Sequence, residues 1–233
     1  MMQRREFAKN IGLGLLATHS FSSFASSNLF ELKNSRIPIG LCNHSLRSLG
    51  LNAQQLIEYA IEQKLDSVLL NTLQPFENFE KKHLSDLKKM ANANGVSIYI
   101  GAGSISKKSS SFSKNYKSAE DVLSEGIRVA SIIGSPVVGC RIGNIDDRYA
   151  EGGIAAHIEA VVKVMKSMQT QILDAGVKVA FENHAGDLRS SELLELIEET
   201  GTDICGALFD PANAFWAMED PMHVLNKLGS NII

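Results

Sequence analysis

Residues 177–184, Val-Lys-Val-Ala-Phe-Glu-Asn-His, and residues 204–213, Ile-Cys-Gly-Ala-Leu-Phe-Asp-Pro-Ala-Asn, share one pattern, an apolar run that leads to a carboxylate. Each apolar run is typical of a buried strand, and a helix-like stretch separates the two. Strands joined through a helix run parallel, so Glu182 and Asp210 should emerge at the same edge of one sheet. In parallel α/β folds, catalytic and binding residues gather at that edge.

The alternation of strand and helix patterns extends outward from this pair over most of the chain. Predicted strands cover residues 37–42, 67–70, 96–100, 136–140, 177–181 and 204–209, and predicted helices cover 53–63, 79–94, 118–134, 153–175, 190–199 and 220–228. Such apolar strands indicate a parallel sheet covered on both faces, as in a doubly wound sheet or a (β/α)₈ barrel. The first strand is followed by Asn43-His44-Ser45 rather than by a phosphate-binding glycine loop, which favours the barrel.

The last residues predict a further strand. Gly229 resembles a helix stop, and Asn231-Ile232-Ile233 resembles the opening of a seventh strand. A complete eight-unit barrel needs about 250 residues. We therefore expect an α/β chain that holds about six βα units of a (β/α)₈ TIM barrel plus the start of strand seven, truncated at its C-terminal side. On this expectation the chain alone is inactive.

One connection is unusually long. After the strand predicted at 96–100, a segment rich in Gly, Ser and Lys continues to about Tyr116. Its length suits a mobile lid, but its polar composition favours a solvated insertion. We expect this segment to lie in solvent.

The N-terminal residues have the pattern of an export signal. Arg4 and Arg5 precede a short apolar stretch at 11–17, and small residues follow up to Ala25. Paired arginines of this kind resemble the twin-arginine signal. We expect residues 1–25 to be a twin-arginine-type signal peptide, residues 36–233 to form the partial barrel, and the protein to be periplasmic or exported through the twin-arginine machinery.

The composition suits an ordinary globular protein and disfavours one class, the proteins that bind nucleic acid. The chain has 233 residues, of which 44% are hydrophobic, and a net charge of −3. These values suit one globular domain and argue against binding nucleic acid through its phosphates. The widely spaced cysteines Cys42, Cys140 and Cys205 lie within or just after apolar runs, and we expect buried thiols without a disulfide.

The βα repeats, Glu-Asn-His at 182–184 and Phe-Asp-Pro-Ala-Asn at 209–213 together resemble the xylose-isomerase-like TIM barrels, and within them the sugar phosphate isomerase/epimerase group. The resemblance covers residues 36–233. It implies one divalent metal ion (Mn²⁺, Mg²⁺, Zn²⁺ or Co²⁺) at the mouth of the barrel. Its ligands would be a Glu after strand five, an Asp after strand six, a His after strand seven and a Glu after strand eight. Glu182 and Asp210 match the first two.

The activity implied by this resemblance is a metal-dependent isomerisation or epimerisation of sugars or sugar-like polyols through proton transfer and an enediolate. Glu182 would be both a metal ligand and the catalytic base. His184 and Asn213 would bind substrate oxygens, and Arg141, just past the fourth strand, would hold an anionic or polyhydroxylated substrate. The expected partner is therefore a small sugar or polyol and not a nucleic acid, and formation of a homo-oligomer is left open.

Other interpretations of the same residues remain open. Glu182 alone would also suit a salt-bridged loop, and Asp210, which precedes Pro211, would suit a turn or a helix N-cap. Two other functions fit the fold: a metal-dependent endonuclease and a non-catalytic carbohydrate-binding barrel. The acidic charge balance and the export signal favour the isomerase over the nuclease.

Overall fold

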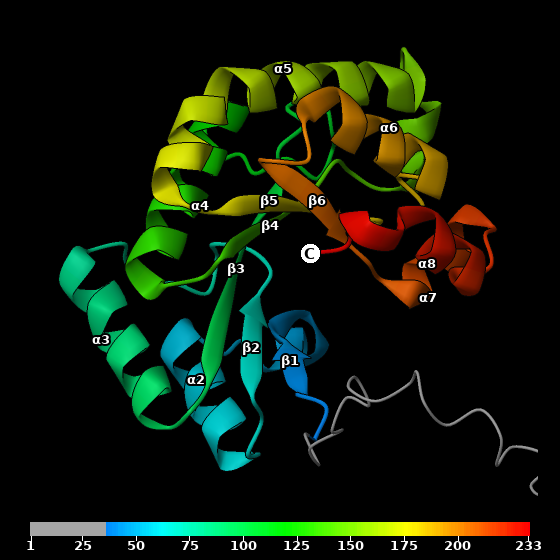
Figure 1. Ribbon diagram of the computed structural model, residues 1–233. Helices are drawn as coiled ribbons and strands as arrows, with labels where there is room; N and C mark the ends of the chain where they lie inside the picture. The colour runs from blue at the N-terminus through cyan, green and yellow to red at the C-terminus, as the bar shows by residue number, and fades with distance from the viewer. Residues whose placement is uncertain (1–35) are drawn as a thin grey trace, which may run out of the picture. The chain divides into compact units, whose positions relative to one another are not determined.

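Six parallel strands pair in the order of the sequence in the computed structural model, which describes residues 36–233. The strands are β1 (Gly40–Cys42), β2 (Ser67–Leu70), β3 (Ser97–Ser104), β4 (Val137–Arg141), β5 (Lys178–Glu182) and β6 (Cys205–Leu208). The signal peptide predicted at residues 1–25 lies outside the described residues. In Figure 1 the strands follow one another from blue β1 to orange β6.

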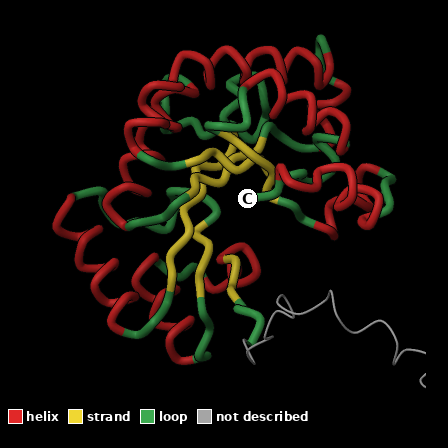
Figure 2. The backbone as a smooth tube through the Cα atoms, in the orientation of Figure 1, coloured by secondary structure: helices red, strands yellow, loops and turns green. Residues whose placement is uncertain are grey.

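Helices connect successive strands. They are α2 (Ala53–Glu62), α3 (Lys81–Ala93), α4 (Ala119–Ile133), α5 (Gly153–Ala175), α6 (Ser190–Thr200), α7 (Pro211–Ala214) and α8 (Pro221–Leu228). Short 3₁₀ helices are η1 (Asn43–Leu49), η2 (Ile145–Tyr149), η3 (Phe215–Ala217) and η4 (Gly229–Asn231). Consecutive helices α3, α4, α5 and α6 contact one another and lie on the outer side of the sheet (Figures 1 and 2).

The predicted fold is confirmed as a parallel α/β sheet with the strand order of an incomplete (β/α)₈ barrel. Sequence-adjacent strands pair throughout, which is the connectivity of a barrel and not of a doubly wound sheet. Beyond β6, Ile232 forms a parallel bridge with Ala207, and the Ile233 amide donates a hydrogen bond to the Ala207 carbonyl at 3.1 Å. Residues 232–233 thus lie where the sequence predicts the opening of strand seven.

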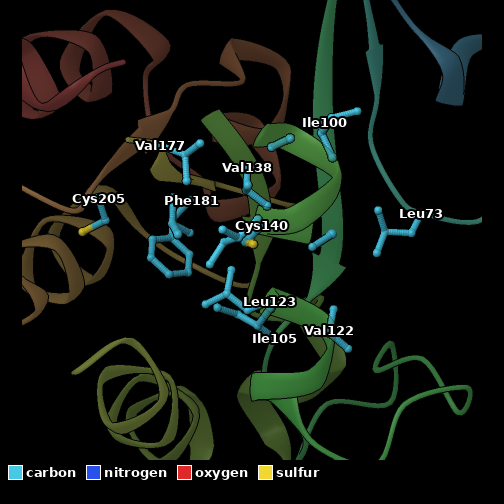
Figure 3. Packing of buried hydrophobic residues seen from close by; sticks show 14 of the residues in the cluster. Leu73, Ile100, Ile105, Val122, Leu123, Val138, Cys140, Val177, Phe181 and Cys205 are labelled. Carbon is cyan, nitrogen blue, oxygen red and sulfur yellow. The ribbon is translucent and has the colours of Figure 1, made fainter. Parts of the chain in front are cut away.

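The core lies between the sheet and the outer helices. Side chains alternate along each strand, so Phe181 of β5 and its register partner Cys140 of β4 point the same way. Figure 3 shows these two side chains beside Leu123 of α4, and all three are buried. On the opposite, inner face, Gly139 of β4 is the register partner of Ala180 of β5. This face ends at Arg141 and Glu182, which line the cleft at the strand ends.

Three strands differ in length from the prediction, and β6 is shorter at both ends, over Cys205–Leu208 and not 204–209. The first strand begins at Gly40 and not at 37, because Ile37 and Ile39 are exposed and β1 pairs only with β2. The third strand continues to Ser104 through a register shift between Gly101 and Gly103. A Cβ on Gly101 would lie 2.4 Å from the backbone oxygen of Asn71, so glycine is required where the two strands approach so closely.

The connection after β3 is not the solvated insertion that its composition suggested. Ile105, Ser106 and Ser109 are buried. The Ser106 hydroxyl lies 2.8 Å from Nδ1 of the buried His157 on α5, and the Ser109 hydroxyl donates to Oδ2 of Asp147 at 2.7 Å. Buried polar partners hold this connection against the body of the fold.

The cysteines agree with the expectation for the described residues. All three cysteines are free thiols, with Cys140 and Cys205 buried and Cys42 half-buried. Within residues 36–233, no helix combines the length and the apolar character that crossing a bilayer requires.

Candidate functional site

A cleft of about 1040 Å³ opens at the carboxyl ends of the strands. Its wall includes every site residue that the sequence predicted: Arg141, Glu182, His184, Asp210 and Asn213. Arg141 and Glu182 are the last residues of β4 and β5, and the other three lie in the segments that follow β5 and β6. The parallel sheet therefore brings together side chains that lie far apart in the sequence.

Two carboxylates meet at one amide nitrogen. Nδ2 of Asn213 donates to Oε1 of Glu182 at 3.1 Å and to Oδ2 of Asp210 at 2.9 Å. The other Asp210 oxygen, Oδ1, accepts the backbone N–H groups of Ala212 and Asn213 and so caps α7. The N-cap interpretation of Asp210 is correct for one oxygen, and the second oxygen faces Glu182 through Asn213.

The environment of Glu182 disfavours its charged form. Burial raises the pKa of Glu182 to about 7, and the charge of Asp210 acts in the same direction, while Arg141 and the Asn213 amide lower it. Among the described residues, Glu182 forms no salt bridge, which removes the alternative of a salt-bridged loop residue. A carboxyl group with a pKa near neutrality can both accept and return a proton.

The middle residue of the Glu-Asn-His motif holds the two strand ends together. The Asn183 side chain accepts the Asp210 N–H through Oδ1 and donates to the Asp210 carbonyl through Nδ2, both at 2.8 Å. Asn183 is buried. Because side chains alternate along an extended backbone, Asn183 points away from Glu182 and His184 and fixes Asp210 beside them.

Hydrogen bonding fixes the tautomer of His184. Nδ1 lies 2.7 Å from the Gly143 carbonyl, and because a carbonyl only accepts, Nδ1 carries the hydrogen. Burial lowers the pKa of His184, and the positive charge of Arg141 lowers it further, although the bond to Gly143 opposes both. A neutral ring with hydrogen on Nδ1 keeps Nε2 as its acceptor.

A buried acid, Asp187, joins the segments after β4 and β5. Its carboxylate accepts the N–H groups of Gly143 at 2.9 Å, His184 at 2.9 Å and Leu188 at 2.6 Å. Burial raises the pKa of Asp187 to about 7, whereas these three donors lower it. Ala185 and Gly186 both have positive φ, 44° and 76°, and this left-handed turn brings Asp187 back toward the His184 amide.

An ion pair supports this turn from outside. Arg148 of η2 donates to both oxygens of Glu192 on α6, at 2.6 and 2.8 Å, and also to the Asp187 carbonyl at 2.8 Å. Both side chains are largely shielded from solvent, at 19% and 20% exposure. This bidentate contact fixes η2 against the start of α6.

The donor set partly fits a divalent metal ion. Glu182 and Asp210 offer the carboxylate oxygens that such cations prefer, on either side of one hydrogen-bond donor. Within residues 36–233, no three His, Cys, Asp or Glu side chains are grouped closely enough to form a complete site. The described residues therefore fit as two of the four ligands that the family resemblance implies.

Sequence reasoning missed the two residues that position the site, Asn183 and Asp187. The sequence analysis gives Asn183 no role, although strand alternation indicates that it points away from Glu182 and His184. Asp187 follows Ala185-Gly186, a polar-turn pattern that gives no sign of burial. Asp187 accepts the amide of Gly143, which follows β4, a different strand. The residues next to Asp187 in the sequence therefore do not indicate this contact.

The comparisons with known proteins agree with the fold of this chain. The profile of the family described as "Xylose isomerase-like TIM barrel" matches residues 48–233. No curated protein matches the chain. Among solved structures, the chain is similar to a xylose isomerase domain protein from Planctomyces limnophilus, with a TM-score of 0.63 and 19% identity, over 84% of this chain and 71% of that one.

Two further solved structures show the same fold. D-psicose 3-epimerase, solved in the presence of D-fructose, has a TM-score of 0.66 and 14% identity over 84% of this chain and 71% of its own. The IOLI protein, solved with a bound zinc atom, has a TM-score of 0.63 and 14% identity over 81% of this chain and 68% of its own. At these identities the likeness is one of fold, and the family assignment comes from the profile. The chain belongs to the xylose isomerase-like TIM barrel family.

Proposed function

We propose that this protein is a divalent-metal-dependent isomerase or epimerase of a sugar or sugar-like polyol. The observation that carries the proposal is the convergence of Glu182 and Asp210 on Nδ2 of Asn213. A point within about 3 Å of an oxygen from each carboxylate lies at the strand ends, where barrel enzymes of this architecture act. The two remaining ligands implied by the family, a His and a Glu, would complete the site.

A divalent cation bound there would polarise the carbonyl group of an open-chain sugar. In an isomerisation, Glu182 takes the proton from the carbon beside that carbonyl and returns it to the carbonyl carbon. In an epimerisation, Glu182 takes the proton from one face, and a second acid on the opposite face gives a proton back. The Nε2 acceptor of His184 binds a substrate hydroxyl. Asn213 holds the Glu182 carboxylate in place and Arg141 orients the substrate from the end of β4.

Proton transfer to or from a carbon atom distinguishes the proposed isomerase or epimerase from the two alternative functions. A non-catalytic carbohydrate-binding barrel would bind a sugar but leave its C–H bonds intact, and an endonuclease would act on nucleic acid. Because an isomerase or epimerase breaks a C–H bond next to a carbonyl, it must exchange that hydrogen with solvent or transfer it within the site. Solvent exchange is measurable even where the net conversion is small.

The test uses the full-length gene product loaded with Mn²⁺ and a panel of ketoses and sugar acids in deuterated water. We expect deuterium at the carbon beside the carbonyl, detected by NMR. Glu182→Gln should reduce the exchange rate at least a hundredfold, a range that removal of a general base commonly gives. Asp210→Asn should weaken Mn²⁺ binding at least tenfold, whereas Glu199→Gln, a matched change on an exposed part of α6, should alter neither. Unchanged exchange in Glu182→Gln would refute the proposal.

A further inference from the structure

Arg141 is a partly buried cation without a partner. Its Nε is buried and has no acceptor, and its guanidinium forms no hydrogen bond or ion pair with any residue in the described range 36–233. Arg128 and Arg148, in contrast, each pair with a glutamate. Withdrawing an unpaired guanidinium from water costs free energy, so the fold carries an unfavourable term at this position.

The position of Arg141 points to a ligand. As the last residue of β4, it shares the inner face of the sheet with Gly139 and lines the cleft next to Glu182 and His184. It also borders a small hollow whose lining includes Gly103 and Gly139. The guanidinium therefore faces space that the described chain does not fill.

The carboxylates near Arg141 already accept hydrogen bonds from other groups. The Asp210 carboxylate caps α7 and accepts from Asn213, Glu182 also accepts from Asn213, and Asp187 accepts three backbone N–H groups. The backbone donors of the neighbouring segment are used as well, Gly143 N–H by Asp187 and Asn144 N–H by Asp147. Arg141 is therefore left without a protein partner beside Glu182, and the amides of Gly143 and Asn144 are already occupied.

This donor set suits a carboxylate better than a phosphate. A guanidinium binds a carboxylate through two parallel hydrogen bonds and matches its single charge. A phosphate carries up to two charges and is usually met by several backbone amides, which are occupied here. The two carboxylates beside Arg141 would also repel a dianion more strongly than a monoanion.

We propose that Arg141 is a carboxylate-binding residue and that the substrate of this site is a sugar acid. The inference rests on the proposed function for the chemistry at Glu182 and narrows its substrate class from sugars in general to hydroxy acids. Arg141 binds the carboxylate end of the acid, and the hydroxylated carbon chain extends from there past Glu182 and His184. Neutral polyols of the same length lack the group that Arg141 recognises.

The test is a binding measurement that needs no turnover. Isothermal titration of the full chain with D-gluconate, D-glucitol and D-glucitol phosphate compares a carboxylate, a neutral group and a phosphate on one carbon skeleton. EDTA in the buffer removes binding through a metal ion. We expect D-gluconate to bind at least about tenfold more tightly than D-glucitol, which corresponds to roughly one charged hydrogen-bond pair.

Variants of Arg141 test whether this residue causes the preference for D-gluconate over D-glucitol. Arg141→Met should remove the tenfold advantage of D-gluconate without changing the affinity for D-glucitol, and Arg141→Lys should keep only part of it because lysine lacks the planar fork. Arg47→Met, which removes an arginine from another part of the cleft wall, should change the gluconate affinity less than twofold. In the absence of ligand, Arg141→Met should melt at or above the wild-type temperature, because an unpaired buried charge is removed.

The outcomes separate this inference from the proposed function. Equal affinity for D-gluconate and D-glucitol, stronger binding of the phosphate, or an equal effect of Arg141→Met on all three probes would refute the carboxylate site. A gluconate preference that depends on Arg141, together with no deuterium exchange in the metal-loaded protein, would keep the carboxylate site and refute the isomerase proposal.

Discussion

Two parts of the chain line much of the cleft: Arg141, Glu182, His184 and Ala185 from the segments 141–149 and 182–190, and several residues from 42–50. The first part, residues 141–149 and 182–190, is called the fastened wall, and its buried residues Gly143, Asp147, Asn183 and Asp187 are each hydrogen-bonded to another segment. The second, the open wall, has no buried residue in η1 and exposes 60% of Leu49. The candidate base and Arg141 belong to the fastened wall, and Asp210 is bound to that wall by Asn183.

The two walls differ in their hydrogen bonds, and we therefore expect them to differ in rigidity. Catalytic side chains need fixed positions, which buried and fully satisfied hydrogen bonds provide. The open wall is attached to the sheet by fewer contacts, such as the bond from the Asn71 amide to Oδ1 of Asn43 at 2.8 Å. We expect the fastened wall to open only with global unfolding and the open wall to open locally.

The largest expected effect is at Asp187. Asp187→Ala leaves the amides of Gly143, His184 and Leu188 buried without an acceptor, so we expect the free energy of unfolding to fall by about 3 kcal/mol. Urea denaturation measures this loss. Asp187→Asn keeps the shape and one acceptor oxygen and should lose less. A loss under about 1 kcal/mol for Asp187→Ala, the scale of a single hydrogen bond, would remove the distinction between the walls.

A matched pair of asparagines compares the walls directly. Asn183→Ala breaks two half-buried hydrogen bonds to Asp210 and should reduce the free energy of unfolding by about 2 kcal/mol. Asn43→Ala breaks one half-buried bond on the open wall and should cost about 1 kcal/mol. Hydrogen exchange should show faster exchange near residue 210 in the first variant and only local changes in the second. The reverse order of losses would contradict the comparison.

The smallest effect depends on pH. Burial raises the pKa of Glu192, but hydrogen bonds from Arg148 and from the Arg189 N–H outweigh it, so the folded pKa lies below the ordinary value of 4.5. Above that value the pair with Arg148 stabilises the fold fully, and its contribution is lost as the pH falls through the lowered pKa.

Arg148→Met should therefore lose about 1 kcal/mol near neutral pH and less in acid. Denaturant titrations of wild type and variant at about pH 7 and about pH 3 give the two differences. A stability difference of equal size at both pH values would show that packing of the arginine stem, and not the ion pair, supports the fastened wall.

Sequence patterns predict a strand correctly where burial restricts its positions to apolar residues. The strand at 67–70 was predicted with the observed bounds, because Val68 and Leu70 are fully buried in the core. The end of β3 was missed, because Gly101-Ala102-Gly103-Ser104 has the composition of a loop, and only the close approach of Asn71 makes those glycines part of a strand. Composition cannot report a contact with a distant segment.

The site was predictable to the extent that its residues follow strands. Glu182 and Asp210 were found because each ends an apolar run, and the five predicted residues line one cleft, although their roles stay predictions. Asn183 and Asp187 act through the backbones of Asp210 and Gly143, and a backbone partner leaves no mark in the sequence. Burial of the Ser106–His157 pair was missed for a different reason: two side chains from distant elements form it, and neither local sequence indicates the other.

The strand order has a consequence for the growing chain. Every strand from β2 onward pairs with the strand made just before it, so no pairing has to wait for a distant part of the sequence. Contacts between neighbouring units are local compared with those of a sheet whose strands are shuffled, and local contacts form quickly. Each βα unit leaving the ribosome thus meets a template already in place, and synthesis can proceed as a series of additions to one growing edge.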